Sequence, residues 1–461
     1  MTSPVRIRSV GVAAPSLRVA AADIAAAWGD RGGKSQLAAC ADDEDVLTLS
    51  WQAATNALDG IDAGSVDALF WGTSRPPYSE GPSYAILATA IGVRMDAGGA
   101  LLAGSPHSGI EALLAGWDAI AAGSARTALV IAADDVLPGL GSAYERRAGS
   151  AAVAYLLSAD EGGAALADRL THTEPVIDRY RGGVEPFTRD VYDARLFREE
   201  TFLPIAGGVG RALDLETARW SLPDPDGRLG GALAKKVGAG TTVTDHFTEL
   251  GDTGAAATLI GAALALTEAG TVGVVAYGGG RSTGVAIEVD EPVAGADRID
   301  LTAGSRSAAY TEVLRARGIL AATGETVAMG VPPMSAGMQR GAREILALCG
   351  AKCVECGVVN TPPSIHPHCL ACGADKFTEV LLARTGTVVT YVVNHTMPAP
   401  FVAPLPLAVV DLEDGSRVML QVTGGAPAAE ALGIGDNVRL VLRRYAVERG
   451  VPVYGYKVER V

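Results

Sequence analysis

Two Cys-x-x-Cys pairs constrain this chain more than any other feature of its sequence. They read CVECG and CLACG, with twelve residues between Cys356 and Cys369. Each pair offers two thiolates to one ion, the following glycine permits a tight turn, and four thiolates complete a tetrahedron without an open position for water. His366 or His368 could replace one thiolate, and four free cysteines are the other alternative. We predict a structural zinc ion bound by Cys353, Cys356, Cys369 and Cys372.

The segment around these pairs holds too little apolar material to fold on its own. Zinc binding in a closed thiolate site is worth on the order of ~10 kcal/mol, so the ion would supply much of the segment's folding free energy. The zinc is therefore predicted to be architectural rather than catalytic.

Bulk composition limits the remaining possibilities. A chain of 461 residues exceeds one ordinary hydrophobic core, so two or three domains are expected, and its 48% hydrophobic residues suffice to bury each. The net charge of −14 argues against a general affinity for nucleic acid or anionic membranes. The sequence has no uninterrupted apolar run of about 18–20 residues, so a cytoplasmic protein is expected.

Residues 1–295 have the pattern of an α/β domain. Short runs of Val, Ile, Leu and Ala alternate with amphipathic stretches, as expected of strands buried between helix layers. A unit of helix, Ala-Gly break and buried strand occurs as WDAIAAGSARTALVIAADD (117–135) and again as LALTEAGTVGVVAYGGG (264–280). Another strand follows each copy, so the domain is predicted to be duplicated.

The rest of the chain divides into three segments. Residues 296–335 are rich in Gly, Ser, Ala and Pro and are predicted to be a linker with one short helix. Residues 336–375 are predicted to form a helix plus the zinc ribbon. Residues 376–461 hold five short β-type runs separated by EDG, GIGD and ERG turns, which favours a five-stranded OB-fold barrel.

The order of helix, zinc ribbon and barrel resembles the DUF35 family of acyl-CoA-associated zinc-ribbon/OB proteins. The residues that carry the resemblance are REILALCGAKCVECGVVNTPPSIHPHCLACGADK (343–376), followed by GTVVTYVV. The resemblance implies a rubredoxin-like ribbon, no binding of nucleic acid, a thiolase-superfamily partner and a contribution to the binding or passage of CoA thioesters. It also implies that the neighbouring domain is thiolase-like.

The N-terminal 295 residues resemble hydroxymethylglutaryl-CoA synthase and the CoA-primed ketoacyl synthases. The similar segments are DEDVLTLSWQAATNAL (43–58), VDALFWGTS (66–74), HSGIEALLAGWDAI (107–120) and GGRSTGVAIEV (279–289). This resemblance implies a duplicated thiolase-like αβαβα fold.

The chemistry of that family requires a cysteine at the start of a buried helix, where the helix dipole lowers the thiol pKa. Here His107 stands in that place. The resemblance puts the family's catalytic histidine near Pro223, its asparagine at Asp252 and its acid/base glutamate at Ser74. Neither remaining cysteine, Cys40 or Cys349, lies where it could replace the nucleophile, so a covalent acyl-cysteine intermediate is not expected.

Two side chains remain candidates for catalysis without a thiolate. His107 is either a general base or thioester-binding group in a retained pocket, or a helix-cap residue. Asp252 precedes TGAAATLIGAALAL and is either a polar catalytic group or the N-cap of that helix.

The other candidates concern binding of a CoA thioester. One is a glycine turn formed by Gly278, Gly279 and Gly280. Such a turn can bring backbone N–H groups close to the thioester carbonyl, or it can simply close a tight loop. Three cations stand where related enzymes often bind the CoA phosphates: Arg228, Lys235 and Lys236. The dipole of the helix explains the two lysines at its end equally well.

These features favour an acyl-CoA-binding subunit of a thiolase or ketosynthase-type complex that forms or cleaves carbon–carbon bonds. The thiolase-like domain is expected to form a homodimer or heterodimer through the strand GGALLAGSP (98–106). One alternative is an independent non-covalent acyltransferase or retro-aldolase that uses His107 or Asp252. Another is nucleic-acid binding, which the nine basic and nine acidic residues of segment 373–461 disfavour.

Overall fold

The computed structural model describes residues 4–190, 193–215, 218–242, 246–320, 341–398, 401, 403–425, 428, 431–448 and 450–461. The chain forms two compact units. The first comprises Met1–Ala88 and Val93–Leu320, and the second comprises Thr89–Gly92 and Ala321–Val461. We describe each unit by itself.

A ten-stranded sheet, in the order β12-β11-β13-β14-β8-β1-β7-β6-β4-β5, forms the frame of the first unit. The strands of its first half are β1 (Arg6–Ala13), β4 (Ala68–Thr73), β5 (Gly98–Ala103), β6 (Thr127–Asp135) and β7 (Ser150–Ser158). Those of its second half are β8 (Ala164–Thr173), β11 (Arg219–Ser221), β12 (Thr241–Thr242), β13 (Gly270–Gly278) and β14 (Arg281–Val289).

Both halves of the sheet have the same topology. In the first, β4 is parallel to β5 and β6, and β7 lies between β6 and β1 and is antiparallel to both. In the second, β11 is parallel to β12 and β13, and antiparallel β14 leads back to β8. A short antiparallel ladder between β1 and β8 joins the halves. The duplication expected from the repeated sequence unit is therefore confirmed.

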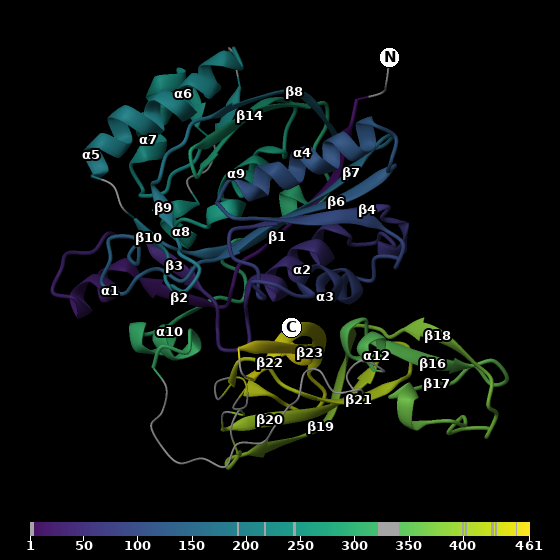
Figure 1. Cartoon of the computed structure of the whole chain (residues 1–461). Helices are drawn as coiled ribbons and strands as arrows, with labels where there is room; N and C mark the ends of the chain where they lie inside the picture. The colour runs from purple at the N-terminus through teal and green to yellow at the C-terminus, as the bar shows by residue number, and fades with distance from the viewer. Residues whose placement is uncertain are drawn as a thin grey trace. The chain divides into compact units, whose positions relative to one another are not determined.

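Helices separate and cover the two halves of the sheet, in five layers (Figure 1). The outer helices are α2 (Val46–Ala57) and α3 (Ser83–Ile91) on one side, and α6 (Leu203–Ala212) and α7 (Leu229–Val237) on the other. The inner helices are α4 (Ser108–Ala121) and α9 (Ala257–Ala265). Gly109 lets α4 approach the turn just before α9, since a Cβ on Gly109 would lie 2.0 Å from the carbonyl oxygen of Ala255.

A smaller layer packs beside this core. Strands β2 (Leu17–Ala20), β3 (Gln36–Ala39) and β15 (Arg306–Ser307) form a sheet, and α1 (Ala21–Ala27) and α10 (Tyr310–Ala316) contribute to its apolar cluster. Residues 296–320 thus lie in the N-terminal unit, whereas the sequence analysis placed a linker over 296–335. Residues 321–340 lie outside the described part of the chain, and the other domain limits remain predictions.

The short elements of the first unit surround the ends of its strands. They are η1 (Ala63–Ser65), β9 (Arg179–Tyr180), β10 (Arg189–Asp190), α5 (Ala194–Leu196), the π-helical turn η2 (Phe197–Phe202), α8 (Phe247–Leu250), η3 (Gly254–Ala256) and η4 (Ala296–Arg298).

The second unit holds a ribbon and a barrel. The ribbon follows helix α12 (Ala342–Leu346) and consists of β16 (Cys349–Cys353), β17 (Val359–Asn360), η5 (Pro363–Ile365) and β18 (Phe377–Leu381). The barrel strands are β19 (Thr385–Asn394), β20 (Leu405–Leu412), β21 (Arg417–Gln421), β22 (Asn437–Glu448) and β23 (Val451–Arg460).

These five strands are ordered β21-β20-β19-β22-β23, and a parallel bridge between Val422 and Val458 brings the two outer strands together. Side chains such as Val388, Val410 and Val458 fill the interior. The predicted OB fold is therefore confirmed. Within the described residues, no helix combines the length and apolar character needed to cross a membrane.

Candidate functional site

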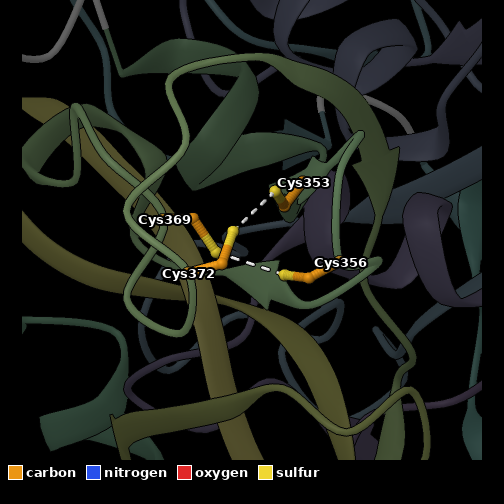
Figure 2. Close-up of side chains that lie close together, drawn as sticks. All are labelled: Cys353, Cys356, Cys369 and Cys372. Carbon is orange, nitrogen blue, oxygen red and sulfur yellow. Dashed lines mark hydrogen bonds between the residues drawn. The ribbon is translucent and has the colours of Figure 1, made fainter.

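The four predicted cysteine ligands converge in the ribbon (Figure 2). The Sγ atoms of Cys353 and Cys372 are 3.6 Å apart, and those of Cys356 and Cys369 are 3.5 Å apart. All four sulfur atoms lie within 4.8 Å of one another. Zn–S bonds of about 2.3 Å in a tetrahedron separate the sulfurs by roughly 3.8 Å, so the donor set fits a closed zinc site. Neither histidine of the spacer belongs to this cluster of described residues.

The glycines that follow the pairs have the role that the sequence suggested. Gly357 and Gly373 adopt φ values of 76° and 77°, and their N–H groups donate to the carbonyl oxygens of Cys353 and Cys369. A side chain at either position would strain this left-handed conformation.

Sequence analysis missed Asn360, which links the two knuckles. Its buried amide donates to the carbonyl oxygen of Val358 at 3.2 Å and lies 3.7 Å from the Cys369 Sγ. Its Oδ1 accepts from the Leu370 N–H at 2.9 Å. Asn360 therefore holds the first knuckle against a ligand of the second, and it can orient that sulfur toward a metal.

A second candidate site lies at the start of α4, in a pocket of about 590 Å³ that includes the space at its mouth. Pro106, Pro223, Asp252, Gly278 and Gly279 line it together, although they come from distant parts of the chain. Two of the positions that the synthase resemblance marked for the reaction, Pro223 and Asp252, thus meet here, together with Pro106, which precedes the third. The remaining lining residues are Asp178, Arg179, Phe197, Phe202, Asp224, Pro225, Gly254, Ala257, Thr258, Ala276 and Tyr277.

His107 is absent from the lining because its ring is buried in the protein. It precedes α4 at the N-cap position, and its Nε2 shares a 2.9 Å hydrogen bond with the Thr283 Oγ1. Its Nδ1 lies 3.3 Å from a Glu111 carboxylate oxygen, without the alignment of a hydrogen bond. Burial and the nearby Arg281 lower the pKa of His107 to about 4. The imidazole is therefore neutral at pH 7 and is a weak base.

Asp252 lines the pocket, but its carboxylate is paired. Its Oδ2 lies 2.7 Å from the Arg179 guanidinium, and its Oδ1 accepts from the Gly254 N–H at 3.0 Å. Arg179 also contacts Asp190 at 3.1 Å and stacks over the Tyr144 ring, 3.5 Å from its centroid. The Asp252 carboxylate is therefore part of an ion-pair network rather than a free polar group in the pocket.

Ser74 stands at the position expected for the synthase's glutamate and acts as a donor instead. Its N–H and hydroxyl donate to the Asp134 Oδ1 at 2.7 and 2.9 Å, and the Ala255 N–H donates to Oδ2 at 2.7 Å. Burial raises the pKa of Asp134 to about 6, although these hydrogen bonds oppose the shift. Sequence analysis missed Asp134, because its partners lie about 60 and 120 residues away.

The three cations predicted to bind CoA lie on α7 and do not line the pocket. Arg228 is the exposed N-cap residue, whereas Lys235 and Lys236 lie in the last turn before the left-handed Gly238. The pocket residues that precede α7 are thus separated from the lysines by roughly 10 Å along the helix. Gly280, the third residue of the glycine turn, also lies outside the pocket lining.

Comparison with known proteins follows this division of the chain. The family described as the C-terminal OB-fold domain of ChsH2 matches residues 379–443. A DUF35 domain-containing scaffold protein of Methanocaldococcus jannaschii is 36% identical over 124 residues, which cover 26% of this chain and 85% of that protein.

Relatives of the first unit are synthases. Hydroxymethylglutaryl-CoA synthase of Aeropyrum pernix is 28% identical over 190 residues, 39% of this chain. The match covers 53% of that synthase, so the chain spans about half its length. A solved structure of MvaS in complex with 3-hydroxy-3-methylglutaryl coenzyme A superposes with a TM-score of 0.61 at 19% identity, covering 71% of this chain and 95% of MvaS. The two proteins share the thiolase-like fold.

The chain therefore belongs to the family of DUF35 domain-containing proteins, and it carries that domain after a thiolase-like domain similar to hydroxymethylglutaryl-CoA synthase.

Proposed function

We propose that this chain is the acyl-CoA-binding subunit of a thiolase or ketosynthase-type complex that forms or cleaves carbon–carbon bonds of acyl thioesters. The observation that carries the proposal is a pocket that holds Pro223 and Asp252, two of the positions that the synthase resemblance marks for the reaction, and that has no cysteine in its lining. Gly278, Gly279 and Pro106 still line it, while His107 is held against Thr283. A subunit of this kind binds the thioester and leaves covalent chemistry to a partner.

The DUF35 module is proposed to bridge the partners. Its relative in Methanocaldococcus jannaschii is described as a scaffold protein, and a closed four-cysteine site gives such a module rigidity without catalysis. A CoA thioester is the proposed ligand of the thiolase-like unit, because solved structures of the same fold contain 3-hydroxy-3-methylglutaryl coenzyme A or CoA. Arg228, Lys235 and Lys236 remain the proposed contacts of the CoA phosphates.

The open edge at β5 supports pairing of the thiolase-like unit. β5 ends the ten-stranded sheet, and its glycine and alanine residues are exposed. An edge strand left in water offers unpaired backbone groups to a second chain. We propose that this edge pairs with a second copy or with a thiolase-fold partner.

The contacts of the two candidate catalytic groups disfavour an independent enzyme. A general base must reach the proton that it removes, but the His107 ring does not line the pocket and the Asp252 carboxylate is paired with Arg179.

The test compares three preparations: this chain alone, a thiolase encoded beside its gene, and the two together. Carbon–carbon bond formation or cleavage on an acyl-CoA should require the mixture, and the two proteins should co-purify. Full turnover by this chain alone would instead support the independent enzyme.

A further inference from the structure

We infer that the pocket selects CoA thioesters with an uncharged acyl group and rejects those whose acyl chain ends in a carboxylate. The inference rests on the proposed function and names its substrate class. It follows from the composition of the pocket wall, which combines apolar rings and prolines with carboxylates.

Aromatic rings and prolines form the apolar part of the pocket wall. The Phe202 and Tyr277 rings meet edge to face with centroids 5.2 Å apart, and the Phe197 ring lies 5.8 Å from Phe202 and 6.0 Å from Tyr277. Pro106 and Pro223 extend this surface. A pocket with such walls is suited to an apolar chain, since burying apolar area supplies most of the affinity.

The only cation among the described lining residues, Arg179, is already neutralised. Its guanidinium contacts Asp252 at 2.7 Å and Asp190 at 3.1 Å, and its face lies against the Tyr144 ring. A carboxylated ligand would have to displace one of these carboxylates to reach Arg179. The pocket therefore lacks the free guanidinium that would recognise a carboxylate.

Asp178 adds a further negative charge to the wall. Its side chain is buried, and its Oδ1 accepts a hydrogen bond from the backbone N–H of Arg179 at 2.6 Å. No ion pair within the described ranges of the chain joins it to a cation. Asp224 lines the same pocket. An acyl carboxylate would lose its water and face these carboxylates, whereas a methyl end would not.

The experiment measures binding of hexanoyl-CoA, adipoyl-CoA and free CoA to the full chain by calorimetry at pH 7. The two thioesters have acyl chains of equal length and differ at the far end. We expect hexanoyl-CoA to bind about tenfold tighter than adipoyl-CoA, or more, as like charges in a poorly hydrated pocket repel. Equal affinity, or tighter binding of adipoyl-CoA, would overturn the inference while leaving the proposed function intact. Failure of all three ligands to bind would overturn both.

Substitution of Asp178 tests the origin of the selectivity. Asp178→Asn should reduce the preference for hexanoyl-CoA, and Asp224→Asn provides a second variant if the first does not fold. Asp168→Asn is the matched control, because Asp168 also accepts the N–H of the following residue, at 2.7 Å, but lies exposed on β8. An unchanged preference in both pocket variants would contradict the role assigned to these carboxylates.

Discussion

His107, which the synthase resemblance puts at the nucleophile position, has the contacts of a structural side chain. Thr283 binds its Nε2, and Thr171 lies 2.8 Å from the Thr283 hydroxyl, so a chain of polar groups links α4 to β14 and β8. These hydrogen bonds stabilise the fold only while every polar group keeps its partner, because a buried polar group without a partner lowers the free energy of unfolding by about 1–3 kcal/mol.

The His107 environment predicts a loss of stability in acid. Its pKa is about 4 in the folded protein and 6.5 in the unfolded chain, so the unfolded chain alone binds a proton between these values. Native stability should fall as the pH drops from 6.5 to 4, by up to roughly 3 kcal/mol. His107→Ala should remove this contribution, which urea unfolding at pH 7 and pH 5 measures.

The same variant tests the inert role of His107. Turnover of the reconstituted complex should not change. A fall of about 100-fold or more at unchanged stability and assembly is the effect of a lost general base, and would make His107 catalytic.

Asp134 has the opposite pH dependence. Its pKa is about 6 when folded and 3.8 when unfolded, so the folded protein binds the proton first as the pH falls. This contribution stabilises the native state fully below pH 3.8 and is lost as the pH rises through 6, with a range of roughly 3 kcal/mol. Asp134→Asn should remove it, so stability should fall more steeply from pH 6 to pH 4 than in the native protein. A pH profile parallel to that of the native protein would contradict the assignment.

Asp134→Asn should also destabilise the protein at pH 7. The side-chain NH2 of the asparagine would face the Ala255 N–H, where the carboxylate oxygen Oδ2 now accepts. Because two donors cannot pair, the lost hydrogen bond should cost about 1–3 kcal/mol.

At the residue scale the sequence predicted positions better than contacts. The place of His107 directly before α4 agrees with the predicted start of that helix, whereas its correspondence to the nucleophile stays a prediction. The Arg179–Asp252 pair and the Asp134 hydrogen bonds could not be anticipated, since each depends on how loops from distant segments meet. Asn360 had no local signal either, because a lone asparagine after a Cys-x-x-Cys pair is equally suited to a turn.

At the scale of single elements, the ribbon predicts one zinc ion per chain. Closed thiolate sites couple metal binding to folding, so removal of the ion should unfold the C-terminal module. Elemental analysis of protein purified without added metal, together with circular dichroism before and after chelation, measures both effects. A folded module with zinc content near zero would contradict the site.

Asn360 is predicted to tune this site. Asn360→Ala should lower zinc affinity about 10–100-fold, the usual effect of removing a group that orients a metal ligand. The Co²⁺-substituted protein should show an altered thiolate charge-transfer spectrum, which a general loss of stability would not produce. Asn437→Ala, at an exposed position of β22, is the control and should match the native protein in both measurements.

If the thiolase-like unit pairs through the exposed edge of β5, we expect one charged side chain on that strand to prevent the pairing. Leu101→Lys puts an ammonium group on the edge strand at a partly exposed position, so the mass in light scattering should fall by half while the circular dichroism spectrum is retained. Met95→Lys, 89% exposed before the strand, should leave the mass unchanged. A native chain that is monomeric at every concentration, with candidate partners present, would contradict the pairing.

Elements were predicted where the pattern is local. Buried strands, the repeated unit and the five barrel strands each follow from periodicity within ten or so residues. The extent of the first unit did not, because β15 pairs with β2, whose residues lie almost 290 positions earlier. One short helix was predicted in this segment and corresponds to α10, but no property of segment 306–320 alone shows that the segment belongs to the first unit.

At the scale of the whole molecule, the chain combines a pocket without a nucleophile and a ribbon without an open metal position. Among the residues that the structure describes, no cysteine outside the predicted zinc site is exposed to carry an acyl chain. Cys40 and Cys349 are buried, and the four ribbon thiolates would be occupied by the ion. Both features fit the proposed function, in which this chain contributes binding and assembly and the covalent step takes place on a partner.

Intact-mass spectrometry after incubation with an acyl-CoA tests this conclusion. This chain should acquire no acyl adduct, whereas a partner thiolase in the same tube should acquire one on its cysteine. The substitution His107→Cys should not restore acylation, because residue 107 does not line the pocket, Pro223 offers no base and Asp252 is held by Arg179. The native chain treated with iodoacetamide controls for adventitious thiol reaction. An adduct that maps to this chain, and that turns over with the substrate, would show that it carries a nucleophile of its own.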